Sequence, residues 1–235
     1  MQDKKTTILT KNKEKTMKSK IIMLLCLVCT AFVATSCLND SNDNSSNYVP
    51  LTPEQKHTLC MLSSGSYQGY VYYAKEGDSS KADSTLINYV VNDSTLTMND
   101  YPVKSLAPYV NDASVKAILA EAPGAKVNFD FTGYEIISSS AAVAATYYSL
   151  WMVPQYKNYK YSTSFKSEKD GKTHTIDITF STGLRFYNNI YYAMASYQGG
   201  NMQANIIVTD VAVDSNTYGV NNVFGMRGKK GGYNL

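Results

Sequence analysis

Histidine, cysteine and tryptophan are scarce in this sequence, which contains two, four and one of them. That shortage excludes the dense cysteine and histidine patterns of zinc modules and of disulfide-stapled secreted domains. His57 and His174 lie far apart in the chain and have no metal-ligand spacing. We therefore expect neither a metal nor any other cofactor.

No apolar run is long enough to cross a membrane as a helix. The longest, residues 21–33 (IIMLLCLVCTAFV), would extend only about 20 Å, against roughly 30 Å for the hydrocarbon core of a bilayer. Lys18 and Lys20 precede the run and small residues follow it, which is the arrangement of a secretion signal. We expect residues 1–36 to be a signal peptide, with Met17 as the true start.

The cysteines divide between this leader and the rest of the chain. Cys26 and Cys29 have CxxC spacing, but they lie in the expected leader and carry no redox or zinc function. Cleavage leaves only Cys37 and Cys60. We assign a lipid to Cys37, and we expect Cys60 to be a small buried hydrophobic residue in a helix. No disulfide within the mature chain is then expected.

Basic residues are also few once the leader is set aside. The whole chain has 22 basic and 19 acidic residues and a formal net charge of +3. Residues 1–36 hold seven lysines, one aspartate and one glutamate, which leaves 15 basic and 17 acidic residues, a charge of −2. Such a body lacks the basic surface that nucleic-acid binding requires, so nucleic acid is excluded as a partner.

The mature chain divides into a tether and one domain. Residues 38–47 (LNDSNDNSSN) hold too little apolar area to fold, so we assign residues 37–50 to a lipidated flexible tether. Residues 51–235 have the length that one hydrophobic core can organise, and we expect a single domain there.

Two short helices are predicted in this domain. Thr52-Pro53-Glu54-Gln55 has the cap, first-turn proline and glutamine of a capping box, which predicts a helix that stops at Gly65. A second helix is expected from Asp112 to Ala122, because apolar residues recur on one side and Pro123-Gly124 follows.

The remaining sequence is typical of β-strands, and three tight turns predict hairpin registers. Each register places apolar residues on one face and polar residues on the other. The predicted turns and facing pairs are Asp170-Gly171 with Phe165–Ile176, Gly199-Gly200 with Ala195–Ala204 and Ala193–Ile206, and Asn92-Asp93 with Tyr89–Leu96.

Further strands are predicted at residues 65–76, 125–138 and 217–226, which are rich in tyrosine and β-branched residues. Residues 141–154 fit either an Ala-rich helix or a buried strand over its second half. With about nine strands, we expect a mainly β fold. It would be an antiparallel β-sandwich or barrel with two short peripheral helices.

Catalytic patterns are weak. Residues 65–69 (GSYQG) have tyrosine where a nucleophile elbow needs serine. His57, on the first helix, and His174, three residues beyond a predicted turn, are expected to be ordinary surface residues. We expect no enzyme, with a hydrolase as a minor alternative. Glycoside hydrolysis would need a carboxylate pair, and the sequence does not select one among Asp130, Glu135, Asp177 and Asp210.

Several segments together resemble a known group of proteins. Ala34-Thr35-Ser36-Cys37 resembles the lipobox of bacterial lipoproteins, although many carry leucine where this chain has Ala34. With the tether, residues 51–55 (LTPEQ), 65–70 (GSYQGY) and 101–106 (YPVKSL), the chain is similar to uncharacterised lipoproteins of about 200 residues from the Bacteroides group. The resemblance implies lipidation of Cys37 and an outer-membrane location, facing the periplasm or the cell surface. It implies no activity, cofactor or further site residue.

Tyrosine is the abundant residue, with twenty copies against seven phenylalanines. Its aromatic face and hydroxyl suit the binding of sugars or protein surfaces, although it is also a common strand residue. The sequence favours a non-catalytic binding module for a glycan, peptide or apolar ligand, held at the membrane by lipid. The alternative is a structural subunit of a surface assembly such as a pilus, with the basic residues 227–232 as a tail.

Overall fold

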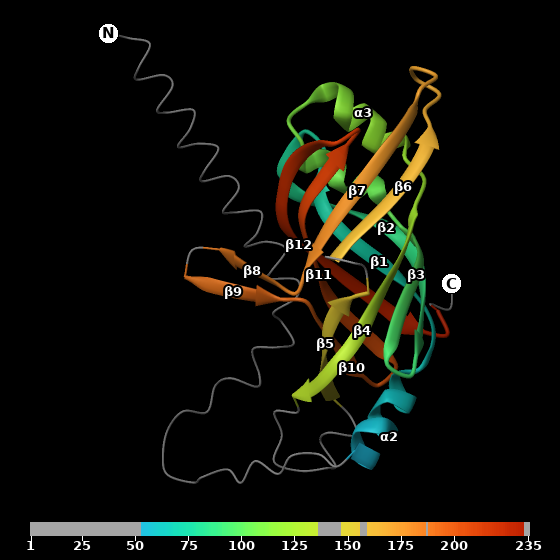
Figure 1. Cartoon of the computed structure of the whole chain (residues 1–235). Coiled ribbons are helices and arrows are strands. Elements are labelled where there is room, and N and C mark those ends of the chain that lie inside the picture. Colours follow the sequence, from blue (N-terminus) through green and yellow to red (C-terminus); the bar gives the residue numbers. More distant parts are fainter. Residues whose placement is uncertain (1–52, 136–146, 156–158, 187, 233–235) are drawn as a thin grey trace.

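The computed structural model describes residues 53–135, 147–155, 159–186 and 188–232 (Figure 1). The expected signal peptide, the lipidation site Cys37 and the tether lie outside these residues. The mainly antiparallel β fold with few short helices is confirmed, although the described residues form twelve strands instead of about nine. No helix in the described part of the chain is long and apolar enough to cross a membrane.

The elements occur in an order dominated by strands. The helices are α2 (Pro53–Ser63), the 3-10 helix η1 (Val103–Tyr109) and α3 (Ala113–Glu121). The strands are β1 (Gly65–Lys75), β2 (Asp78–Asn92), β3 (Thr95–Tyr101), β4 (Ala125–Glu135), β5 (Tyr147–Pro154), β6 (Lys160–Lys166), β7 (Thr173–Ser181), β8 (Gly183–Phe186), β9 (Asn189–Tyr192), β10 (Met194–Gln198), β11 (Asn201–Val213) and β12 (Asn216–Lys230).

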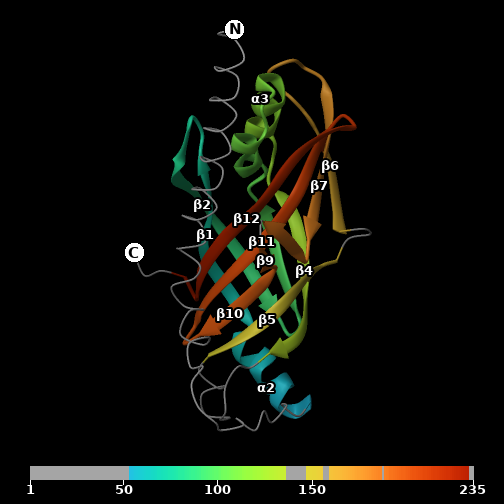
Figure 2. The same cartoon turned by 90° about the vertical axis from the view of Figure 1, so that its left-hand side faces the viewer.

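Ten strands form one curled sheet in the order β10-β5-β4-β3-β2-β1-β12-β11-β7-β6. Because β10 also pairs with β11, eight of these strands close into a ring at one end, while β7 and β6 extend from the other half of β11. The domain is thus a half-open barrel and not a sandwich. Figures 1 and 2 show α2 at the closed end and α3 at the opposite end beside β6 and β7.

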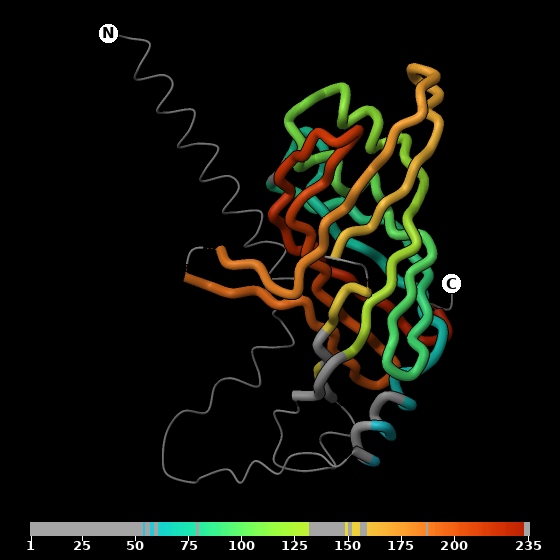
Figure 3. Tube along the Cα trace, in the orientation of Figure 1, coloured from blue at the N-terminus to red at the C-terminus, as the bar shows by residue number. Residues whose placement is uncertain are grey.

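The β8–β9 hairpin is separate from the main sheet. The tube in Figure 3 shows it standing away from the curl of the other strands. Its Leu184 and Tyr191 face each other and pack against the core, whereas Ile190 is 44% exposed. One face of the hairpin therefore packs against the barrel, and the other face is exposed to solvent.

Alternation along the strands places the core inside the curl. In β1, Tyr67, Val71 and Tyr73 are buried, while Gln68 and Tyr70 between them face outward. Aromatic rings fill the interior in stacked and edge-to-face pairs. These pairs are Tyr67 with Tyr89, Tyr101 with Phe180, and Phe129 with Phe180.

The predicted helices are confirmed. The helix expected to stop at Gly65 is α2, and its cap, Thr52, lies outside the described residues. The second predicted helix is α3, where the Asp112 side chain accepts the N–H groups of Ser114 and Val115 as an N-cap. The 3-10 helix η1 was not predicted, because Pro108 within it argues against a helix.

The register predicted for the Gly199-Gly200 hairpin is confirmed next to the turn and is wrong farther from it. Ala195 faces Ala204 as predicted. The pairing then ends, so the predicted Ala193–Ile206 pair does not form. The chain before β10 turns away to form the β8–β9 hairpin, which a simple two-strand register does not anticipate.

The hairpin placed at Asp170-Gly171 has the predicted faces but a register shifted by two residues. Phe165 faces His174 and not Ile176, because the loop has four residues, 168–171, instead of two. A shift of two keeps every side chain on its own face of the sheet. The apolar face is therefore still inward, but the neighbours of His174 are different from those expected.

The Asn92-Asp93 hairpin shows the same kind of error. Tyr89 faces Met98 instead of Leu96, since the turn residues are Asp93 and Ser94. Asp93 adopts a φ of 50°, a left-handed conformation that aspartate tolerates at tight turns. The apolar and polar faces again remain as predicted.

Two further segments, residues 141–154 and 227–230, contain strands in the structure. The second half of residues 141–154 is strand β5, while residues 141–146 lie outside the described part. Residues 227–230, interpreted as part of a basic tail, belong instead to β12, between β1 and β11. These residues are three cations and one glycine, which conceals the strand pattern in the sequence.

Candidate functional site

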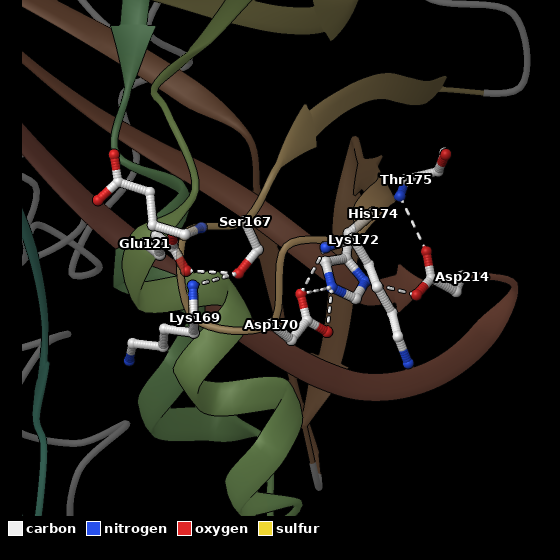
Figure 4. A network of polar contacts seen from close by, with 9 residues as sticks. Glu121, Ser167, Lys169, Asp170, Lys172, His174, Thr175 and Asp214 are labelled. Carbon is white, nitrogen blue, oxygen red and sulfur yellow. Dashed lines mark hydrogen bonds and ion pairs between the residues drawn. The ribbon is translucent and has the colours of Figure 1, made fainter.

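His174 lies on β7 beside the β6–β7 loop and is only 5% exposed, so the expectation of a surface residue is wrong (Figure 4). Its Nδ1 is 2.6 Å from Oδ2 of Asp214, in the β11–β12 turn. Its Nε2 is 3.1 Å from Oδ2 of Asp170, in the β6–β7 loop. The four-residue loop folds Asp170 over the ring, and the turn after β11 supplies the second carboxylate.

The charges in this cluster shift one another's pKa. Hydrogen bonding to Asp214 raises the pKa of His174 above 6.5; burial opposes this shift, and Asp170 adds to it. The backbone N–H of Thr175 and the His174 ring lower the pKa of Asp214. The backbone N–H of Lys172 is the main cause of the lowered pKa of Asp170, with burial opposing and His174 contributing. The arrangement therefore favours a protonated imidazole between two carboxylates.

Glu121, at the end of α3, extends this network to the helix (Figure 4). Its carboxylate accepts the Ser167 hydroxyl at 2.7 Å and also the backbone N–H of Glu168. The Ser167 hydrogen bond is the largest cause of the lowered pKa of Glu121. As a result, α3, the β6–β7 loop and the β11–β12 turn are joined by charged hydrogen bonds at this end of the barrel.

The geometry gives His174 a structural role. Both ring nitrogens are engaged by carboxylates, so the protonated ring has no lone pair with which to act as a base. The nearby Ser167 hydroxyl donates to Glu121 and not to the imidazole. Among the described residues, no cluster of three His, Cys, Asp or Glu side chains could hold a metal ion.

The other residues considered for chemistry are dispersed. His57 is a surface residue of α2, with Nδ1 3.8 Å from Oδ1 of Asp93. Asp130 on β4 accepts the side-chain amide of Gln155. The side chains of Cys60 and Glu135 lie outside the described part of the structure.

Asp177 and Asp210 are the other two candidate carboxylates. Asp210 faces Thr179, two residues along β7 from Asp177, so the two carboxylates lie on neighbouring strands. Asp177 is 2.6 Å from Nζ of Lys160 and accepts the Ser162 hydroxyl. Burial would raise the pKa of Asp177, but these two partners outweigh it and lower the pKa. A carboxylate with a lowered pKa is unsuited to the general acid role of a glycosidase.

Most described tyrosines serve packing. Tyr109, for example, accepts the N–H of Ala74 and the amide of Asn222 at 2.9 Å each, and burial raises its pKa. Few are exposed on the outside of the molecule. The exposed ones are Tyr70, Tyr159 and Tyr192.

Tyr70 belongs to a patch on the outer wall of the barrel that we call the outer strip. The patch comprises two adjacent cross-strand rows of outward-facing side chains on β2, β1, β12 and β11. One row is Leu86, Tyr70, Arg227 and Gln203, and the other is Asn88, Gln68, Lys229 and Asn201.

The barrel wall beneath the outer strip is tightly packed. The Tyr67 and Tyr89 rings stack inside it, with centroids 5.0 Å apart and planes 8° apart. Gly69 and Gly228 face each other between the rows, and a Cβ on Gly69 would lie 1.9 Å from the Arg227 carbonyl oxygen. The two glycines allow β1 and β12 to pair over the stacked rings. The strip is therefore carried on a rigid support.

The outer strip combines an exposed aromatic ring, four side-chain amides and two cations. This combination can stack against a ligand ring, donate and accept hydrogen bonds and attract negative charge. The outer strip could not be recognised in the sequence, since its members come from four strands. The alternating Gln68-Gly69-Tyr70 and Arg227-Gly228-Lys229 segments were the only available signal.

Comparison with known proteins places the domain in a family. Residues 63–213 match the family described as a domain of unknown function (DUF4840). No curated protein and no protein of solved structure matches the chain. The expectation of an uncharacterised family is therefore confirmed, while the lipoprotein character and the Bacteroides group remain expectations.

Proposed function

We propose that this chain, which belongs to the DUF4840 family, is a lipoprotein anchored by Cys37 whose β domain is a non-catalytic binding module. The anchor is supported by the apolar core at residues 21–33 and by the small residues before Cys37. Its location would be the outer membrane, with the domain in the periplasm or at the cell surface.

One observation carries the binding role: an aromatic and an aliphatic side chain are exposed side by side on the rigid outer strip. Tyr70 is 37% exposed and Leu86, directly opposite on β2, is 50% exposed. The hydrophobic core beneath these strands is filled by other residues, so it does not require the side chains of Tyr70 and Leu86. Exposed aromatic residues on a rigid support bind ligands at a low entropic cost.

Binding can be tested with the soluble mature chain carrying Cys37→Ser, screened against glycans, extended peptides and fatty acids. Tyr70→Ala should weaken the binding of any hit by about tenfold, because one stacked aromatic ring is lost. Tyr192→Ala, which removes a similarly exposed ring from the β8–β9 hairpin, is the matched control. Equal effects of the two variants would contradict a site at the outer strip.

The anchor has its own test. The Cys37→Ser precursor should lose its acyl label and be either unprocessed or soluble, because the acylated sulfur is absent. Three acyl chains, at about 0.8 kcal/mol per buried methylene, would otherwise hold it effectively permanently. Unchanged fractionation and labelling of the variant would refute lipidation at Cys37.

A second candidate function, a structural subunit of a surface assembly, is favoured by the position of β6. This strand ends the sheet order and pairs only with β7 among the described strands. An edge strand can accept a strand from another molecule. Concentration-dependent oligomers that are blocked by Ser164→Pro would support it, because proline removes an N–H from the edge. A monomer at all concentrations would exclude assembly through the chain alone.

A further inference from the structure

We propose that the outer strip binds an acidic polysaccharide, a glycan chain that carries carboxylate or sulfate groups. This inference rests on the proposed binding role and adds the class of ligand and the residues that would recognise it. Three features of the strip carry the inference: its charge, its amides and its shape.

The charge of the outer strip is opposite to that of the mature chain. Arg227 lies directly beside Tyr70 and Lys229 directly beside Gln68 in the pairing of β1 with β12. None of the eight side chains that define the strip is a carboxylate, whereas the chain from Cys37 onward carries a net −2. A local excess of two cations on an otherwise acidic protein complements an anionic ligand.

The amides distinguish a sugar chain from a purely ionic or apolar ligand. The four amides of the strip are Gln68, Asn88, Asn201 and Gln203. Each amide offers donors and an acceptor, which suits hydroxyl groups that themselves donate and accept. Gln68 and Asn88 are near enough to make a long contact of 3.5 Å, so they form a continuous polar row beside Tyr70.

The shape of the strip suits an extended chain. The rows cross four neighbouring strands, which spans about 14 Å at the usual strand spacing. The two rows lie about 7 Å apart, since they are separated by two residues along each strand. A ligand lying across the strands would contact Tyr70 by its ring and the flanking cations by its acidic groups.

The test uses the soluble mature chain with Cys37→Ser and isothermal titration against polygalacturonate, chondroitin sulfate and neutral dextran. We expect the acidic chains to bind and dextran to bind at least tenfold more weakly. Lys229→Gln should weaken acidic-chain binding by about 1.5-fold to fivefold, the range for an exposed ion pair. Lys104→Gln, which removes an exposed cation from η1, should leave it unchanged.

The possible outcomes separate this inference from the binding role. Equal binding of dextran and the acidic chains, lost in Tyr70→Ala but not in Lys229→Gln, would overturn the acidic ligand and keep the module. Equal binding of polyadenylate and polygalacturonate would also overturn the proposal, because it would show that the strip attracts any polyanion and does not recognise a polysaccharide. If no polysaccharide binds while a peptide or fatty acid binds in a Tyr70-dependent way, the glycan class is wrong and the binding role stands.

Discussion

The two ends of the barrel are held together by different forces. Under the outer strip, the closed end is organised by the stacked rings of Tyr67 and Tyr89 and by the contact between β1 and β12 at Gly69. At the other end, α3 and two turns are joined by hydrogen bonds of charged groups around His174 and Glu121. The first kind of contact depends on shape and the second on protonation.

This difference indicates that the stability of the closed end depends little on pH, whereas the stability of the opposite end depends on the protonation of its charged residues. Apolar packing is insensitive to pH, so the residues that support the outer strip should keep their arrangement as the pH changes. The charged network should weaken when any of its members changes protonation. The following variants test that contrast, from the largest expected effect to the smallest.

Tyr67→Ala should lower the free energy of unfolding by about 3–5 kcal/mol, because it leaves a large cavity beside Tyr89. Tyr67→Phe should cost only about 1 kcal/mol, since it removes just the hydroxyl that donates to the Ser63 carbonyl at 2.6 Å. Urea unfolding at one pH measures both. Similar losses in the two variants would show that the hydrogen bond to α2, and not the ring, holds this end.

Gly69→Ala should destabilise the closed end by about 1–3 kcal/mol through overpacking against the Arg227 backbone, which cannot move as a side chain can. Gly183→Ala is the control, because its new Cβ would meet nothing closer than 3.5 Å. Urea unfolding compares them, and binding by the outer strip should fall with stability only in Gly69→Ala. A neutral Gly69→Ala would mean that β1 and β12 are free to separate.

His174→Gln should destabilise the charged end by less than Tyr67→Ala does the closed end, and the loss should depend on pH. The pKa of His174 is raised in the folded state, so its contribution is complete below pH 6.5 and disappears as the pH rises through the folded value. The lowered pKa values of Asp170 and Asp214 limit the contribution on the acid side, below 3.8.

The stability difference between wild type and His174→Gln should therefore shrink as the pH increases from 6.5 through the folded-state pKa of His174. Unfolding curves at a series of pH values measure it, with Tyr67→Phe as a variant whose deficit should stay constant from pH 6 to 8. A pH-independent difference for His174→Gln would show that the ring contributes by packing and not by charge.

Glu121→Gln should have the smallest effect, because it keeps one acceptor oxygen, although it removes the charge and replaces the second acceptor oxygen with an NH2 group, so that only one of the two hydrogen bonds to Ser167 and Glu168 can form. We expect faster hydrogen exchange at the Glu168 amide with little change in global unfolding. Glu168→Gln is the control, since it alters a neighbouring side chain but keeps the same backbone donor. Unchanged exchange would mean that α3 is held by its apolar residues Val115 and Leu119 alone.

Short-range features of the sequence predicted much of the fold. The Asp112 cap and the apolar side of α3 are encoded within one helix, and the alternating residues of β1 define its inner face. The Gly199-Gly200 turn also predicted the correct facing pair, Ala195 with Ala204, because a two-residue loop leaves little freedom.

Only the tertiary structure decided the register of the other hairpins and the residues of the two sites. A four-residue loop shifts the pairing by two without exposing any apolar face, so alternation could not detect it. Asp214 reaches His174 from a separate hairpin, and the outer strip needs four strands to pair in register. The sequence by itself determined which side of each strand is apolar, because that depends on near neighbours. Which polar residues meet across the sheet depends on loop lengths and on distant pairing.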